Sequence, residues 1–360
     1  MKGFLLLTAG KVGACFFALF ATAGFCRAAV AEVPPAKIYY VADTAALTPA
    51  REVNPGVVRR MVDRLIMAAT GQPDVARAWG SLVKTTDRVG IKVSAAGGAV
   101  SGTNPQVVDA IVDGLKAAGL PASRIIVWDR NIEDLIAAGY RRDGSRYSLR
   151  WVDRATGYDP QAQVNAPVLG KLIWGDFGFG DRSGSRFSDM SGEQLSNKSF
   201  YSKILSREVT KIINVPSLTD SFLTGINGAL ANMVLPNIDN WRRFTKPPSY
   251  GDPYLAEIYA DAMIKEKVAL TILDGLVLQY AGGPFANPGF LQDHFTIYAS
   301  RDPVAVDATA MRLVDDARKP SKLPSLALTT GWLQSATGIG LGQHAADQIE
   351  LIPVGAEGPR

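Results

Sequence analysis

Five short runs of apolar, often β-branched residues lie along the chain, and each run stops at a polar residue. The runs cover residues 89–92, 124–129, 210–214, 270–274 and 295–300. Continuous apolar runs of this length predict strands that are buried on both faces of a sheet. Ligands of open α/β sheets lie in the crevice beyond the carboxyl ends of the strands. We therefore expect one site, formed by the residues at which the runs stop: Lys92, Asp129, Asn214, Asp274 and the corner from Ser300 to Asp302.

Segments with helical spacing alternate with these runs. Asn54 and Asn104 each precede a proline, a pair that predicts the start of a helix. The spacing of apolar residues carries the first helix to Thr70 and the second to Ala118. The second helix joins two predicted strands, and such a βαβ unit implies parallel strands with a right-handed crossover. We predict an α/β fold with a mixed, mostly parallel sheet flanked by helices.

The last predicted strand breaks this alternation. About twenty residues, rich in glycine and proline, separate Asp274 from the strand at 295–300, and they contain no obvious crossover helix. Parallel neighbours need a crossover of roughly a dozen or more residues, usually a helix. The orientation of this strand is therefore open, and antiparallel pairing would move Ser300 to the opposite edge of the sheet.

Residues 140–200 differ from the rest of the chain. Gly, Ser, Arg and Asp dominate there, and the apolar residues follow no strong period. Such a stretch is typical of an irregular insertion that covers a site. The alternative is a small β-rich subdomain that packs its own aromatic residues, and the sequence leaves both open.

The first 31 residues set the expected compartment. Lys2 precedes an apolar stretch, and the small residues at 29–31 fit signal-peptidase cleavage before Glu32. Lys11 interrupts the stretch and leaves each half too short to span a membrane. We therefore expect residues 1–31 to be a signal peptide and residues 32–360 to be a single α/β domain. The mature protein is then expected to be periplasmic or secreted, with no stable membrane span.

Composition narrows the chemistry. Both cysteines, Cys15 and Cys26, lie in the expected signal peptide, so a mature form would have none. Disulfides, cysteine nucleophiles, Cys-ligated zinc and iron–sulfur clusters would then be excluded. The 38 basic and 34 acidic residues nearly balance, and the basic residues do not interleave with aromatic ones. Nucleic acid is therefore not an expected partner.

Two longer motifs carry a resemblance to a known family. Residues 212–232 read IINVPSLTDSFLTGINGALAN, and residues 299–308 read ASRDPVAVDA. Together they resemble the two hallmark segments of the bacterial and archaeal family called domain of unknown function 362, with supporting matches at 89–93 and at Asp274-Gly275. The resemblance runs from about Arg88 to Val314. It implies a fold and the location of a site, whereas the family has no settled reaction.

The resemblance also implies a difference. The family's first motif usually carries Lys and His along its loop and a further Lys before the final Asn, where this chain has Thr219, Ser221 and Ala231. If those basic groups bind an anion or transfer protons in relatives, that role is weakened or moved here. Some members carry Cys-rich, ferredoxin-like segments. This chain has no such segment, so no iron–sulfur cluster is expected.

Lys92 and Asp307 are the candidate catalytic residues. Asp307 lies at the edge of the apolar face of its predicted helix, and a carboxylate near a core needs a partner because burying it alone is costly. We expect that partner to be Lys92 or backbone N–H groups of the 214–228 segment. Asp302 precedes a proline, as helix caps do, and it stands with Asn214 and Ser300 among the candidate ligand-binding residues.

Residues 223–233 predict a short helix with a small, polar face. Such a face holds an anion on free backbone N–H groups or, alternatively, serves only for capping and close packing. On the first interpretation Thr224, Gly225 and Asn227 bind the ligand. Asp129 and Asp274 are candidate ligands for a hard divalent cation such as Mg²⁺ or Ca²⁺, which prefers oxygen. An ion pair between Asp129 and Arg130 at the strand end and a turn at Asp274-Gly275 are the simpler interpretations.

Two functions fit these residues. The first is a small-molecule site at the strand carboxyl ends, in an enzyme that acts on an anionic or polyol substrate with help from carboxylates or a divalent cation. The second is a non-catalytic ligand-binding or scaffold protein whose site degenerated when the basic groups were lost.

Overall fold

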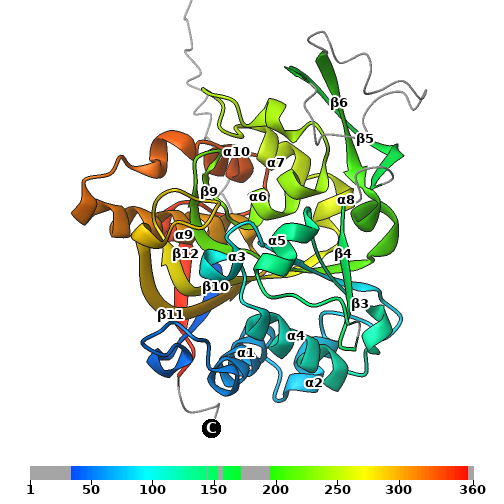
Figure 1. Ribbon diagram of the computed structural model, residues 1–360, viewed down its shortest axis with the longest axis vertical. Helices are drawn as coiled ribbons and strands as arrows, with labels where there is room; N and C mark the ends of the chain where they lie inside the picture. The colour runs from blue at the N-terminus through cyan, green and yellow to red at the C-terminus, as the bar shows by residue number, and fades with distance from the viewer. Residues whose placement is uncertain (1–33, 144, 153–156, 172–194, 356–360) are drawn as a thin grey trace, which may run out of the picture. The chain divides into compact units, whose positions relative to one another are not determined.

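The computed structural model describes residues 34–143, 145–152, 157–171 and 195–355. Pro35–Arg360 forms one compact unit, built on a ten-stranded sheet with helices on both faces (Figure 1). The expected signal peptide lies outside the described residues. Among the helices that are described, none has the length and apolar character needed to cross a membrane.

Eight strands follow one another across the sheet, and two more attach at its middle. The order across the sheet is β12 (Ile349–Pro353), β1 (Ala36–Ala42), β11 (Leu291–Ser300), β10 (Val268–Gln279), β7 (Lys211–Val215), β2 (Val89–Val93), β3 (Ile125–Asp129) and β4 (Ser148–Trp151). β8 (Ser217–Ser221) pairs with β10, and β9 (Gly225–Ile226) pairs with β8. Six of the nine pairings described for this sheet are parallel, which confirms the predicted mixed, mostly parallel α/β fold.

Two hydrophobic cores lie between the sheet and its two layers of helices. One packs the strands against α1 (Pro55–Thr70), α2 (Val75–Gly80) and α4 (Pro105–Ala117). The other packs them against α6 (Ala229–Val234), α7 (Tyr254–Tyr259), α9 (Pro303–Arg318) and α10 (Trp332–Gly338). Figure 1 shows the first group below the sheet and the second above it. Three short helices lie in the connections: α3 (Gly98–Ser101), α5 (Ile132–Ala137) and α8 (Ala262–Lys265).

The two helices predicted from Asn-Pro pairs are both present. The Asn54 side chain accepts hydrogen bonds from the backbone N–H groups of Gly56 and Val57 at 3.2 and 3.3 Å, and this satisfies two donors that the first turn of α1 leaves open. α1 ends at Gly71, whose φ of 67° is the left-handed conformation that glycine adopts without strain. α4 begins at Pro105 as predicted, but the Asn104 side chain does not cap it.

β11 runs antiparallel to both of its neighbours, β10 and β1. Its register pairs Ser300 with Thr271 near the start of β10, and Ile297 with Asp274. The connection after β10 contains only a 3₁₀ turn, Pro288–Phe290, and the chain returns as a hairpin instead of crossing over. Of the two orientations left open by the sequence, the antiparallel one is therefore correct.

The sequence pattern predicted no strand for β1 or β12. Both lie at or next to one edge of the sheet and remain partly exposed, so neither has the continuous apolar run of a central strand. Their pairing is parallel, and it joins the first and last strands of the described chain.

The described part of the 140–200 segment contains β structure. β4 extends the main sheet, while β5 (Tyr158–Lys171) and β6 (Leu195–Ser202) form a separate antiparallel pair. Val152, Tyr158 and Phe200 form a small apolar cluster of their own. Of the two alternatives, the β-rich subdomain matches the residues that are described, and the remainder of the segment lies outside them.

Candidate functional site

Lys92 is the centre of a buried polar network. Side chains alternate along β2, so Ile91 enters the core beneath α1 and α4 while Lys92 points to the α6 side of the sheet. The Lys92 ammonium donates to Asp129 Oδ1 at 2.7 Å, to Asn232 Oδ1 at 3.0 Å and to the Val93 carbonyl at 2.6 Å. Its side chain is 0% exposed. Three acceptors for three N–H bonds are the pattern that satisfies a charged lysine.

Asp129 compensates the charge of Lys92 and also fixes the backbone after two strands. Its Oδ1 accepts from the N–H of Arg130, and its Oδ2 accepts from the N–H of Ala95, each at 2.7 Å. Burial lowers the pKa of Lys92, and the attraction of the Asp129 carboxylate opposes that change. Asp129 does form an ion pair at the end of its strand, but its described partner is Lys92, whereas Arg130 donates to it through the backbone N–H.

Two asparagines extend the network. Asn232 Nδ2 donates to Asn214 Oδ1 at 2.8 Å, and Asn214 Nδ2 donates to the Ala229 carbonyl at 3.0 Å. Both side chains are buried. Sequence reasoning did not select Asn232, although it is the last residue of the 212–232 motif. Its position there was the available signal.

Asp307 holds the start of α6. Its carboxylate accepts from the backbone N–H of Ala229 and, at 2.9 Å, from that of Leu230. Burial raises the pKa of Asp307 to about 7, although these two hydrogen bonds oppose the rise. A Cβ at Gly228 would overlap the carboxylate, so glycine is needed there. The buried carboxylate was anticipated, but pairing with Lys92 was wrong, and its backbone partners lie just beyond the 214–228 segment.

Asp274 does not join this network. It follows Ile272 by two residues on β10, so it points to the α4 side of the sheet, opposite to Lys92 and Asn214. Its Oδ2 accepts from Asn104 N at 2.7 Å and from Asn104 Nδ2 at 2.9 Å. Burial raises the pKa of Asp274. The expectation of one shared site was therefore wrong, because side chains at neighbouring strand ends can point to opposite faces of the sheet.

Ser300 and Asp302 lie elsewhere, since β11 is antiparallel. Ser300 Oγ donates to the Lys37 carbonyl at 2.7 Å. Asp302 caps α9 by accepting from Ala305 N at 2.8 Å, and it also accepts from Gln343 N at 2.9 Å. The capping interpretation of Asp302 is the one that the geometry supports.

The predicted helix at 223–233 was wrong in its first half. Gly225 has a φ of 79° and pairs with Ser221 in the β8–β9 hairpin, and α6 begins only at Ala229. Thr224 Oγ1 donates to the Ile226 carbonyl at 2.8 Å, and Asn227 Nδ2 donates to Ser94 Oγ at 2.7 Å. These residues shape a turn and do not form a helical face, and Asp307 already occupies the first N–H groups of α6.

The three positions where the resemblance implied lost basic groups are buried. Thr219 and Ser221 lie on β8, and Ala231 lies on α6 in the core. Ser221 Oγ accepts from Leu223 N at 3.1 Å, so it stabilises the turn that follows β8.

A divalent cation was expected at Asp129 and Asp274. The carboxylate of each already accepts hydrogen bonds from protein donors on both of its oxygens. Across residues 34–143, 145–152, 157–171 and 195–355, no group of three or more His, Cys, Asp or Glu side chains could hold a metal ion.

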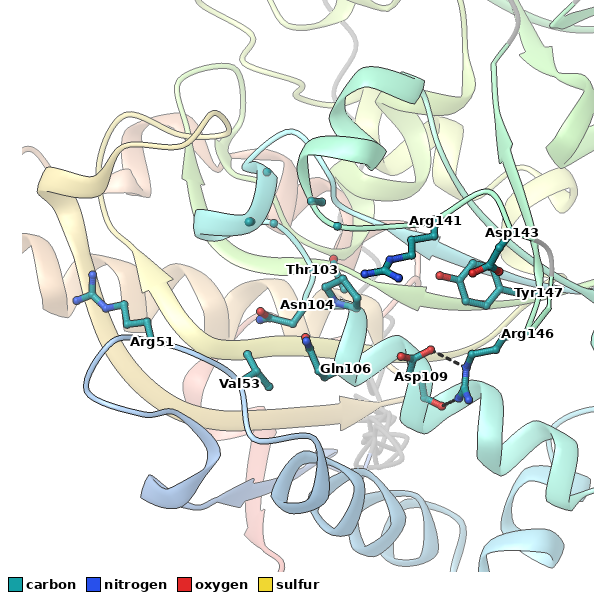
Figure 2. A pocket seen from close by; sticks show the side chains of 16 residues that line it. Arg51, Val53, Thr103, Asn104, Gln106, Asp109, Arg141, Asp143, Arg146 and Tyr147 are labelled. Carbon is teal, nitrogen blue, oxygen red and sulfur yellow. Dashed lines mark hydrogen bonds and ion pairs between the residues drawn. The ribbon is translucent and has the colours of Figure 1, made fainter.

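An open pocket lies on the α4 side of the sheet, next to the loop that follows β2. Its volume is about 550 Å³. One wall is formed by the loop after β2 and by the start of α4, at residues 98–109, and another by the segment after α5, at residues 138–147 (Figure 2). The polar or charged residues in its lining are Arg51, Thr103, Asn104, Gln106, Asp109, Arg141, Asp143, Arg146 and Tyr147.

The three arginines of the pocket differ in how they are compensated. Arg146 donates to Asp109 at 2.9 Å and to Asp113 at 2.5 Å, and Arg51 pairs with Asp293 at 2.5 Å. Arg141 has no hydrogen-bond or ion-pair partner among the described residues, and Figure 2 shows its side chain turned into the pocket. Sequence reasoning missed it because it is an exposed residue in the 140–200 segment, without a motif.

The Asn104–Asp274 contact shapes the same pocket. Because Asp274 binds the Asn104 side chain, that side chain cannot cap α4, and the first turn of this 13-residue helix meets the pocket without a side-chain cap. The amino end of a helix carries a partial positive charge. In α4, however, Pro105 has no N–H, Val107 and Val108 donate to the Asn104 carbonyl, and the Asn104 N–H donates to Asp274. Arg141 is therefore the stronger attraction for an anion in the pocket.

Fold and site together define an α/β protein with a sealed polar network and, separate from it, an open polar pocket. The chain belongs to the family described as domain of unknown function (DUF362), whose model matches residues 89–312. This match confirms the resemblance seen in the two motifs, and it includes Lys92, Asp274 and Asp307 as well as most of the pocket.

A search of solved structures found a crystal structure of a protein from Thermotoga maritima, solved by a structural genomics consortium. It is 14% identical, with a TM-score of 0.38, over 75% of this chain. The match spans 59% of the length of that chain. A search of curated proteins found no match.

Proposed function

We propose that this protein binds a small, hydroxyl-bearing anion in the open pocket and acts as a ligand-binding protein. The observation that carries the proposal is Arg141, a guanidinium that lines the pocket and makes no hydrogen bond or ion pair among the described residues, with the Asp143 carboxylate as its electrostatic neighbour. The loop that follows the carboxyl end of β2 lines the same pocket, and ligands of open α/β sheets bind beyond such ends. Carboxylate and phosphate groups match the planar, forked donors of arginine.

The other lining residues support a ligand that carries hydroxyl groups as well as charge. Gln106 supplies an amide, and Asp143 supplies a carboxylate that accepts from hydroxyls. Hydrogen bonds from Ser145, together with the positive charge of Arg141, lower the pKa of Asp143, so it is ionised at neutral pH. A volume of about 550 Å³ is in the range of small-molecule sites.

Binding is favoured over catalysis by the state of Lys92 and Asp307. Both are fully buried, and their polar atoms are engaged by protein partners. A group that transfers a proton must come within hydrogen-bond reach of its substrate. Neither residue lines the pocket, so both are better described as positioning residues that hold the strand ends and α6.

The test uses gluconate, a hydroxyl-rich carboxylate, and compares Arg141→Gln with Arg142→Gln. Arg142 is the adjacent cation, but it stacks on Trp151 at 4.3 Å and does not line the pocket. Isothermal titration calorimetry should show saturable binding to the wild-type protein and at least about tenfold weaker binding to Arg141→Gln, which corresponds to about 1.4 kcal/mol. Arg142→Gln should match the wild-type protein.

Sorbitol and inorganic phosphate test the contributions of the hydroxyl groups and of the negative charge one at a time. Sorbitol keeps the hydroxyls without the charge, and phosphate keeps the charge without the polyol, so each should bind more weakly than gluconate. Absence of binding by gluconate and phosphate at millimolar concentration would favour the scaffold function instead. Equal affinities in the two arginine variants would remove Arg141 from the site.

A further inference from the structure

A second pocket of about 500 Å³ lies at the other end of α1. It is bounded by the last turn of that helix and by strands β1 and β12. Its lining is mainly apolar, with Met67 and Pro73 on one side and Ile352 and Val354 on the other. The composition of this pocket is therefore the reverse of the polar pocket near α4.

One cation stands in this apolar lining. Arg64 lines the pocket, is only partly exposed, and has no hydrogen-bond or ion-pair partner among the described residues. Arg59 on the same helix shows the contrast, because it binds Asp63 at 2.9 Å and Asp113 at 2.7 Å. A guanidinium beside an apolar surface and without a counter-ion favours an anionic group.

We propose that this pocket binds an amphipathic carboxylate, with the carboxylate at Arg64 and an aliphatic body against the apolar lining. Burial of the body supplies most of the affinity, at roughly 0.8 kcal/mol per buried methylene. Arg64 selects an anion over a neutral molecule of the same shape. Tyr39, which lines the pocket from β1, adds an aromatic surface with a polar end.

The second site is separate from the polar pocket. Val53, just before α1, lines the polar pocket, whereas Gly71, just after α1, lines the apolar one. The 16 residues of α1 span about 24 Å at about 1.5 Å per residue. The proposal therefore does not depend on Arg141, and Arg141→Gln should leave binding at the apolar pocket unchanged.

Octanoate is the probe, used below its micelle concentration with the full chain. Acetate keeps the charge without the body, and 1-octanol keeps the body without the charge. Arg64→Gln is compared with Arg60→Gln, which removes an exposed cation from the same helix outside the pocket. Ala68→Leu, at a lining position that tolerates a helix former, narrows the pocket.

Calorimetry should show that octanoate binds the wild-type protein and Arg60→Gln alike. Arg64→Gln and Ala68→Leu should each weaken it at least about tenfold, while acetate and octanol should bind more weakly than octanoate. Failure of octanoate to bind at millimolar concentration would overturn the proposal. Equal loss in Arg64→Gln and Arg60→Gln, or octanol binding as tightly as octanoate, would do the same.

Discussion

The residue that most constrains this site is Lys92. A lysine with no exposed side-chain surface is stable only because each of its three N–H bonds has an acceptor. Buried ion pairs add little net stability compared with apolar packing, yet removing one partner leaves the other charge unpaired. The network is therefore better understood as a constraint on geometry than as a source of stability.

Removing Asp129 alone should therefore cost more stability than removing both partners of the buried ion pair. We expect Asp129→Ala to lower the free energy of unfolding by about 3–5 kcal/mol, because the Lys92 ammonium stays buried without its carboxylate. The Lys92→Met, Asp129→Ala double variant should lose less than Asp129→Ala alone, since the orphaned charge is gone. Asp63→Ala is the control. Asp63 pairs with Arg59, and the side chains of Arg59 and Asp63 are 36% and 23% exposed, so this ion pair should contribute under about 1 kcal/mol to the free energy of unfolding. Urea unfolding measures all three, and equal losses in the two single variants would contradict the argument.

Asp307 should make stability depend on pH. Its pKa of about 7 in the folded protein lies above the unfolded value of 3.8, so its contribution is present at acidic pH and is lost as the pH rises through about 7. We expect the free energy of unfolding of the wild-type protein, relative to Asp307→Asn, to fall by about 3 kcal/mol between about pH 5 and about pH 8. Chemical denaturation at the two pH values checks this. A difference that stays constant would mean that the two backbone donors outweigh burial.

At the scale of elements, the sequence predicts best what local chemistry determines. The starts of α1 and α4 follow from Asn-Pro pairs, and the central strands follow from apolar runs. The segment around Gly225 was misjudged because a hairpin and a helix share its local pattern, and the pairing of β8 with β10 is a long-range contact. The prediction of one shared site was wrong for a related reason. A run of apolar residues shows where a strand ends, but it does not show the face of the sheet to which Asp274 or Lys92 points.

The start of α6 should be sensitive to a single methyl group. Gly228→Ala would place a Cβ on the Asp307 carboxylate and break its bonds to the first two N–H groups of α6. We expect a loss of at least about 2 kcal/mol, the scale of leaving buried donors unpaired. Gly338→Ala is the matched control, because it lies at the end of α10 with open space around the added Cβ, and it should be nearly neutral. Thermal melts of both variants test this, and a neutral Gly228→Ala would mean that α6 can shift.

At the scale of the whole molecule, export remains a proposal that rests on residues 1–31. The charged start, the apolar stretch and the small residues at 29–31 lead us to expect cleavage before Glu32. Intact-mass analysis of protein recovered from the producing cell should give a chain that lacks both Cys15 and Cys26. A mass that retains the two cysteines would contradict both the expected compartment and the exclusion of cysteine chemistry.

The parallel pairing of β1 with β12 has a practical consequence for binding assays. Strand β1 starts beside Ile349, the first residue of β12, whereas Val354 and Gly355, just after the end of β12, line the apolar pocket. A linker to a sensor surface, attached ahead of β1, would leave from the end of this strand pair that lies away from that pocket. One attached after β12 would leave at the apolar pocket itself and compete with octanoate for space. Immobilisation ahead of β1 is therefore the geometry in which a slow association rate can be assigned to the apolar pocket.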